Sequence, residues 1–202
     1  MRLSQLPERP VVGLRERKKA RTRAVIQACA LRLFREQGYD ATTVQQIIEE
    51  AEVSERTFFR YFPTKGVVVL WDPFDPLIVE EFQQQPPELS PVQAVRAAFR
   101  TVFGQLSTQA VSEQRDRIQL ILSVPELRAA MMDQFASEMG VLAQALAERT
   151  GRRPGDMGVR TLAGAVIGAA VAAVFAVADE PTANPATLLD EAMAHLEAGL
   201  RL

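Results

Sequence analysis

Apolar side chains recur every three or four residues along most of the chain, which is the spacing of one face of an α-helix. Residues 15–37 show this spacing first, and Gly38 is placed to end the helix that they predict. Nowhere do several runs of alternating β-branched residues stand side by side, so no sheet is expected. The pattern therefore predicts an all-α protein.

Two short helices with a tight turn between them are expected next. Thr43 and Gln46 have the spacing of a capping box, which predicts that a helix starts there. Ser54 can cap a second short helix over residues 55–61. Two short helices joined by a turn of three or four residues have the proportions of a helix-turn-helix unit, here residues 42–65.

Longer helices are predicted for the rest of the chain. Thr64 caps one that Pro73 and Pro76 break or kink, and residues 83–87 read as a loop. One further helix is expected to start at Ser90–Pro91, and a short segment around Ile118 follows it. The next helices are expected from Pro125 to Gly151 and over residues 161–178, and the last starts at Asn184–Pro185.

Residues 161–178 form an uncharged run that is just long enough to span a membrane. Nearly half of the run is alanine, and the helices around it are amphipathic, as in a soluble protein. Small residues allow helices to approach closely, so we expect a subunit interface here instead of a membrane span. The residues expected in this homodimer interface are Ala165, Ala169, Ala173, Leu189 and Leu196.

Charge is distributed unevenly along the chain. The net charge is −2, but residues 1–66 carry +5 and the remainder −7, and the first 35 residues alone carry +8. A basic head on an acidic body indicates a polyanionic partner for the head, although a solvated basic arm would show the same charge. Residues 1–14 are expected to form such an arm. The single cysteine and the lack of an apolar segment behind the N-terminal charges fit a cytoplasmic protein.

The sequence offers little for catalysis. Its one histidine, His195, and its one cysteine, Cys29, lie far apart in the chain. It contains no metal-ligand spacing, nucleophile elbow or phosphate-binding glycine loop, so we predict no enzymatic activity, no metal and no cofactor. A purely architectural DNA-bending protein would not need a second domain twice the size of its head.

The expected second helix of the helix-turn-helix unit carries two arginines on one face, Arg56 and Arg60. Arginine can bind guanine O6 and N7 through two hydrogen bonds, so this helix suits the major groove of double-stranded DNA. Phe58 and Phe62 lie four residues apart and suit anchoring it. The predicted DNA-binding residues are Thr43, Ser54, Arg56, Thr57, Arg60, Tyr61 and Lys65, with Thr57, Tyr61 and Lys65 on phosphates.

Residues 38–65 read G-Y-D-A-T-T-V-x-x-I-x-x-x-A-x-V-S-x-x-T-F-F-R-Y-F-x-x-K, which resembles the signature of TetR-type repressors. The resemblance implies three DNA-binding helices in residues 15–66, then about six helices in residues 67–202 that form a ligand pocket and a homodimer. Such repressors release operator DNA when a small molecule binds. Three residues depart from the pattern: Glu52 stands in place of a turn glycine, where a positive φ would cost roughly 1 kcal/mol, and Phe59 and Gly66 replace a tyrosine and an acidic residue.

The stretch F-F-R-Y-F-P-T-K followed by W-D-P-F-D resembles an actinobacterial subgroup associated with long-chain acyl-CoA thioesters. This resemblance implies an elongated apolar effector in a tunnel of aromatic and methionine side chains. Candidate lining residues are Trp71, Phe74, Phe99, Phe103, Met131, Phe135 and Met139, although such a stripe is also ordinary core. Arg96, Arg100, Arg115, Arg117 and Arg128 are candidates for a phosphorylated head group or are solvated helix charges. Control by a protein partner in place of a small molecule stays open.

Overall fold

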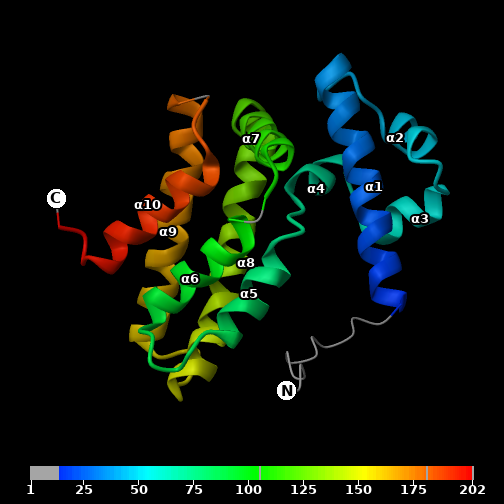
Figure 1. The fold of residues 1–202 in the computed structure, drawn as a ribbon. Coiled ribbons are helices and arrows are strands. Elements are labelled where there is room, and N and C mark those ends of the chain that lie inside the picture. The colour runs from blue at the N-terminus through cyan, green and yellow to red at the C-terminus, as the bar shows by residue number, and fades with distance from the viewer. Residues whose placement is uncertain (1–13, 105, 181, 202) are drawn as a thin grey trace, which may run out of the picture. The chain divides into compact units, whose positions relative to one another are not determined.

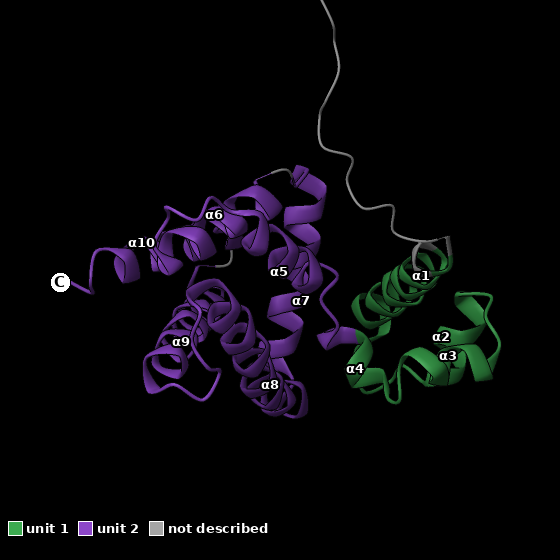
Figure 2. Ribbon diagram, turned by 90° about the horizontal axis from the view of Figure 1, so that it is seen from below, with its two compact units in different colours: residues 1–68 green, residues 69–202 purple. Residues whose placement is uncertain are grey.

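The computed structural model describes residues 14–104, 106–180 and 182–201. Within these ranges the chain forms ten α-helices and no strand (Figure 1), so the all-α prediction is confirmed. The helices divide into two compact units, residues 1–68 and 69–202 (Figure 2), compared with the boundary after residue 66 expected from sequence. Of the expected basic arm at residues 1–14, all but the last residue lies outside the described ranges.

Unit 1 is a small helical head whose elements begin and end at the residues that the caps predict. The hydroxyl of Thr43 accepts a hydrogen bond from the Gln46 amide while the Gln46 side chain accepts one from the Thr43 amide, so the capping box is present. Gly38 ends the first helix with a φ of 88°. The helices of this unit are α1 (Leu14–Gln37), α2 (Val44–Glu50), α3 (Glu55–Tyr61) and α4 (Lys65–Leu70), the last of which continues into unit 2.

Glu52 lies in the turn between α2 and α3 with a φ of 50°, so the left-handed conformation expected at this position is confirmed. The turn is closed by hydrogen bonds from the Glu52 amide to the Glu49 carbonyl and from the Val53 amide to the Ile48 carbonyl. A side chain in this conformation costs roughly 1–2 kcal/mol. The helix-turn-helix keeps its geometry here despite the glutamate, because the flanking buried residues Ile48 and Ala51 hold the turn.

Unit 2 is a bundle of longer helices, and it differs from the sequence expectation in two places. Pro76 does not break a helix, because it lies in the first turn of α5, where a missing amide hydrogen is tolerated. The short segment expected around Ile118 is part of a full helix. The Ser107 hydroxyl caps this helix by accepting a hydrogen bond from the Ala110 amide. The bounds are α5 (Asp75–Gln84), α6 (Pro91–Phe103), α7 (Thr108–Ser123), α8 (Pro125–Thr150), α9 (Met157–Asp179) and α10 (Pro185–Glu197).

A tightly packed core, mostly of small and medium side chains, joins α5, α6, α8, α9 and α10. On its edge Arg96 of α6 donates to Asp190 of α10 at 2.9 Å and to Glu197 at 2.8 Å, and Arg100 lies 3.1 Å from the same Asp190. The hydrogen bond from Arg96 lowers the pKa of Asp190. These ion pairs hold α6 to α10 and leave neither arginine at a cavity wall. The core residues of this cluster are Phe82, Ala94, Val95, Ala98, Ala143, Ala145, Leu146, Ala147, Val159, Ala163, Val166 and Met193.

The apolar helix α9 has an inner and an outer face. Among the described residues it is the one helix whose length and composition would allow a membrane crossing, but it packs along α8 and α10. Its outward stripe is Gly168, Ala172 and Phe175, and Phe175 is 41% exposed. The structure corrects the expected interface in part: Ala173 is buried and Leu189 also points inside the unit, while Ala165, Ala169 and Leu196 are half-buried.

Candidate functional site

Helix α3 is anchored by aromatic residues and presents its polar side outward. Phe58 and Phe62 are fully buried, as the four-residue spacing predicts. The Ser54 hydroxyl accepts a hydrogen bond from the Thr57 amide at 3.2 Å and lies 2.8 Å from the Thr57 hydroxyl. Ser54 is exposed at the start of the helix, as Thr43 is at the start of α2. Both therefore cap a helix and remain open to a ligand at its N-terminus.

The two arginines expected to read bases are both exposed on α3. The guanidinium of Arg60 lies 4.8 Å from the centre of the Tyr61 ring and donates a hydrogen bond to its hydroxyl at 3.3 Å. Arg23 of α1 lies over the same ring at 5.5 Å. Arg23 was not expected at this surface. The sequence places it in a long basic helix but does not show which other helix its side chain faces. The three side chains make one basic and aromatic cluster beside Arg56.

Lys65, expected to contact a phosphate, also makes hydrogen bonds within unit 1. Its ammonium donates hydrogen bonds to the carbonyls of Tyr39 and Thr42, at 2.8 and 3.2 Å. It also lies 4.3 Å from the centre of the Tyr39 ring. Two of its three donors are thus engaged inside unit 1, where they fasten the start of α4 to the turn before α2.

Unit 2 encloses a cavity of about 490 Å³, which is within the range of small-molecule sites. Four of the seven predicted lining residues, Phe99, Phe103, Met131 and Phe135, do line it. The other three do not line it. The ring centres of Phe74 and Phe103 are 5.5 Å apart, Met139 packs on the core, and Trp71 lies one residue before the lining residue Asp72. The remaining apolar lining comes from several helices, above all α5, α7, α8, α9 and α10, and on α9 and α10 it includes Val166, Ile167, Ala170, Val174 and Leu189.

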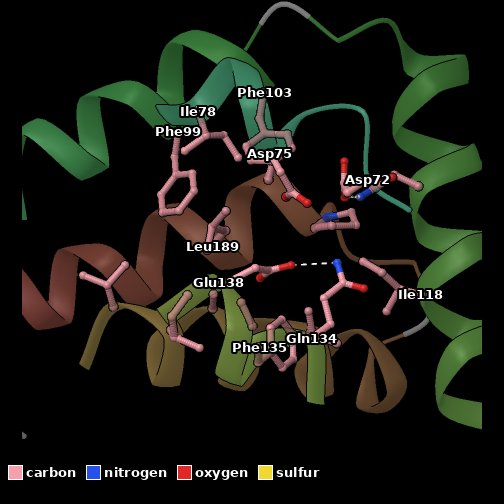
Figure 3. Close-up of a pocket in the computed structure, with 18 of the residues that line it drawn as sticks. Asp72, Asp75, Ile78, Phe99, Phe103, Ile118, Gln134, Phe135, Glu138 and Leu189 are labelled. Carbon is pink, nitrogen blue, oxygen red and sulfur yellow. Dashed lines mark hydrogen bonds between the residues drawn. The ribbon is translucent and has the colours of Figure 1, made fainter. Parts of the chain in front are cut away.

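One end of the cavity is polar (Figure 3). Seven polar side chains line the cavity, of which Figure 3 labels the first four: Asp72, Asp75, Gln134, Glu138, Gln114, Arg117 and Asn184. Only Arg117 was a candidate from sequence. Of the other candidate arginines, Arg115 bonds to Ser112, Arg128 is exposed, and Arg96 and Arg100 pair with α10. The sequence signal that could have indicated this polar wall is the pair of aspartates, Asp72 and Asp75, in W-D-P-F-D.

Arg117 is 7% exposed and holds the end of α4. One guanidinium nitrogen donates to the carbonyls of Val69, Leu70 and Trp71, at 3.1, 3.4 and 3.2 Å. These carbonyls lie at the C-terminus of α4, where a positive charge also suits the helix dipole. The other terminal nitrogen pairs with the carboxylate of Asp72, and Nε donates to Gln114 at 3.3 Å.

Two carboxyl groups face the cavity with weakened acidity. Burial raises the pKa of Asp75 to about 8, and the neighbouring carboxylates of Asp72 and Glu138 add to the rise while Arg117 opposes it. Burial also raises the pKa of Glu138, against the hydrogen bond from Gln134. Both shifts have the same cause: the wall brings three carboxyl groups together around one guanidinium, in partial isolation from water.

Comparisons with known proteins agree with this architecture. Residues 26–70 match the family described as bacterial regulatory proteins, tetR family, and residues 89–201 match the MftR C-terminal domain. The regulator TcmR of Streptomyces glaucescens is 36% identical over 146 residues, which span 69% of this chain and 65% of TcmR, just under two thirds of its length. MftR of Mycobacterium tuberculosis, named for regulation of mycofactocin biosynthesis, is 29% identical over 83% of this chain and 84% of its own.

Solved structures share the fold at low sequence identity. Thermus thermophilus FadR, in complex with lauroyl-CoA, has a TM-score of 0.54 and 23% identity, with 89% of this chain and 95% of FadR covered. SmeT, in complex with triclosan, has a TM-score of 0.55 and 19% identity, with 86% and 90% covered. The two family matches cover the helix-turn-helix unit and most of unit 2. The chain therefore belongs to the TetR family of transcriptional regulators, with an N-terminal unit of the tetR type and a C-terminal domain of the MftR type.

Proposed function

We propose that the protein is a repressor that binds a pseudo-palindromic operator as a homodimer and releases it when a mainly apolar effector enters the cavity of unit 2. The observation that carries the proposal is the place of Arg117. This residue lines the cavity and holds three carbonyls at the end of α4. Since α4 begins in the DNA-binding unit, a ligand that disturbs Arg117 acts on a helix that both units share.

The homodimer follows from the outer face of α9. A two-fold protein presents two recognition helices to half-sites about one helical turn apart, or a multiple of it. A single seven-residue α3 offers too few base contacts for tight specific binding. The outward stripe of Gly168, Ala172 and Phe175 is uncharged and continues along a helix without charge from Thr161 to Ala178. This is the surface we propose for the partner subunit.

A long-chain acyl-CoA is the first effector to test. The lining is mainly aliphatic and aromatic, which suits an acyl chain, and the FadR structure of the same fold carries lauroyl-CoA. The CoA phosphates would have to stay outside, because the one guanidinium among the described lining residues is engaged by Asp72 and the α4 carbonyls. The ligand must bind the DNA-released conformation more tightly than the bound one, since equal affinity shifts nothing.

For DNA binding, Arg56→Ala and Arg60→Ala are each expected to weaken operator affinity by about 1–3 kcal/mol and to relax base preference, because an exposed bidentate arginine is lost. Fluorescence anisotropy with a duplex selected from random sequences measures both effects. Arg128→Ala removes an equally exposed arginine of α8 and is the matched control. Wild-type binding by both α3 variants would refute the recognition-helix assignment.

For the effector, we expect long-chain acyl-CoA to release the operator at concentrations at which free CoA does not. A release of about 100-fold needs about 2.7 kcal/mol of differential binding. Phe103→Arg places a charge in the apolar part of the cavity and should abolish the response while operator affinity stays unchanged. Leu77→Arg, on the exposed side of α5, should respond like wild type. If no apolar compound shifts operator affinity, control by a protein partner becomes the better explanation.

A further inference from the structure

We propose that the effector of this cavity carries a cationic amine on an apolar body, and that the ammonium group binds between the carboxyl groups of Asp75 and Glu138. The inference rests on the proposed function, because it requires that the cavity is the effector site. It goes further by naming the chemical group that the polar end of the cavity selects, and it makes an apolar amine a tighter ligand than the acyl chain of an acyl-CoA, whose anionic head stays outside.

The charge of the wall is the first argument. The ionisable side chains among the described lining residues are three carboxyl groups, Asp72, Asp75 and Glu138, and one guanidinium, Arg117. Arg117 is already neutralised by Asp72 and occupied by the α4 carbonyls. The wall therefore has more acidic groups than basic ones and no cation free to receive an anionic ligand.

The second argument is the set of acceptors that stay open. In the described part of the chain the Asp75 carboxyl takes part in no hydrogen bond or ion pair. Glu138 accepts one hydrogen bond, from Gln134 at 2.7 Å on Oε1, and its Oε2 receives none there. Figure 3 shows the two carboxyl groups coming from facing elements, α5 and α8, toward the same end of the cavity. An ammonium group has three donors and a positive charge, which these acceptors can share.

Other head groups fit less well. A carboxylate or phosphate would add a further negative charge beside Asp75 and Glu138 without a free cation to offset it. A hydrocarbon end would bury two carboxyl groups without a partner, which is costly. A hydroxyl supplies a single donor and no charge. An amine meets both the hydrogen-bonding and the charge requirement of this wall.

Binding of the amine is then linked to a proton. With its pKa raised to about 8, Asp75 holds a proton at pH 6, and it must release this proton to pair fully with the ammonium. The groups that face Asp75 are Asp72, Glu138 and Arg117. An alkylamine stays protonated over this range, as a lysine does. Amine affinity should therefore rise between pH 6 and pH 8.

Three ligands with the same chain test the proposal: decylamine, decanol and decanoate, each titrated calorimetrically into the full-length protein below its micelle concentration. Decylamine is expected to bind about tenfold more tightly than decanol or better, and decanoate more weakly than decanol. Asp75→Asn and Glu138→Gln should each remove most of the preference for the amine and leave decanol affinity unchanged. Glu126→Gln, an exposed carboxylate in the first turn of α8, is the matched control.

The outcomes separate this inference from the proposed function. If decanol and decylamine bind equally, the proposed ammonium site between Asp75 and Glu138 is wrong, while the cavity remains an apolar effector site. If none of the three binds, the cavity is not the effector site and both proposals fail. The pH profile of decylamine binding to the wild-type protein needs no variant: a rise toward pH 8 supports the inference, and a flat profile contradicts it.

Discussion

Arg117→Met should lower the free energy of unfolding by about 3–5 kcal/mol, because it removes the cation that pairs with the largely buried carboxylate of Asp72 and the donor that three helix-end carbonyls share. Methionine keeps most of the volume, so the loss reports hydrogen bonds and charge more than packing. For a chain of this length the midpoint of thermal unfolding should fall by on the order of 10 °C. Circular dichroism at 222 nm measures it directly.

Two comparisons make this prediction specific to the network. Arg115→Met lies two residues earlier on α7, where the arginine donates a hydrogen bond to the Ser112 hydroxyl, and it should change stability little. Adding Asp72→Asn to Arg117→Met removes the orphaned charge and should restore part of the loss. Equal destabilisation by Arg115→Met and Arg117→Met would show that the network at the end of α4 does not stabilise unit 2.

Phe175→Arg should convert the homodimer to a monomer and reduce operator affinity by a factor on the order of 10²–10⁴, because the second half-site contact is no longer intramolecular. The side chain is 41% exposed in one protomer, so the arginine can be accommodated when the protomer is alone. In the proposed interface the same charge would be buried against the uncharged stripe of the partner. Light scattering after size exclusion gives the oligomeric state.

Met132→Arg is the control for this variant, since it places an arginine on a similarly exposed apolar position of α8. It should remain a dimer with wild-type operator affinity. A dimeric Phe175→Arg, or a wild-type protein that is monomeric at micromolar concentration, would show that the outer face of α9 is not the interface.

The sequence was most informative where a local signal decides the structure. The Thr43 capping box, the Ser54 cap and the glycine after α1 give the limits of the head helices to within a residue or two. The left-handed turn at Glu52 was expected from the family resemblance, because a glycine usually stands at that position. Where a proline lies in the first turn, as in α5, the same residue signals a start or a break, and the sequence alone did not distinguish them.

The cavity was predicted less well, because its lining depends on how helices are rotated against one another. Phe99 and Phe74 look alike in sequence, yet Phe99 lines the cavity and Phe74 packs behind Phe103. The same limit applied to α9, where Ala173 turned out buried and Phe175 exposed. Lys65 looked like a free surface cation, and only the fold shows that backbone carbonyls from residues over twenty positions away receive its donors.

The end of α4 also has a spectroscopic consequence. The chain contains a single tryptophan, Trp71, whose carbonyl accepts a hydrogen bond from Arg117 and which directly precedes Asp72. Indole emission responds to nearby charge and to solvent, and here no second tryptophan dilutes the signal. The intrinsic fluorescence of the unlabelled protein is therefore a local reporter on the segment that joins unit 1 to unit 2, and it needs no added probe.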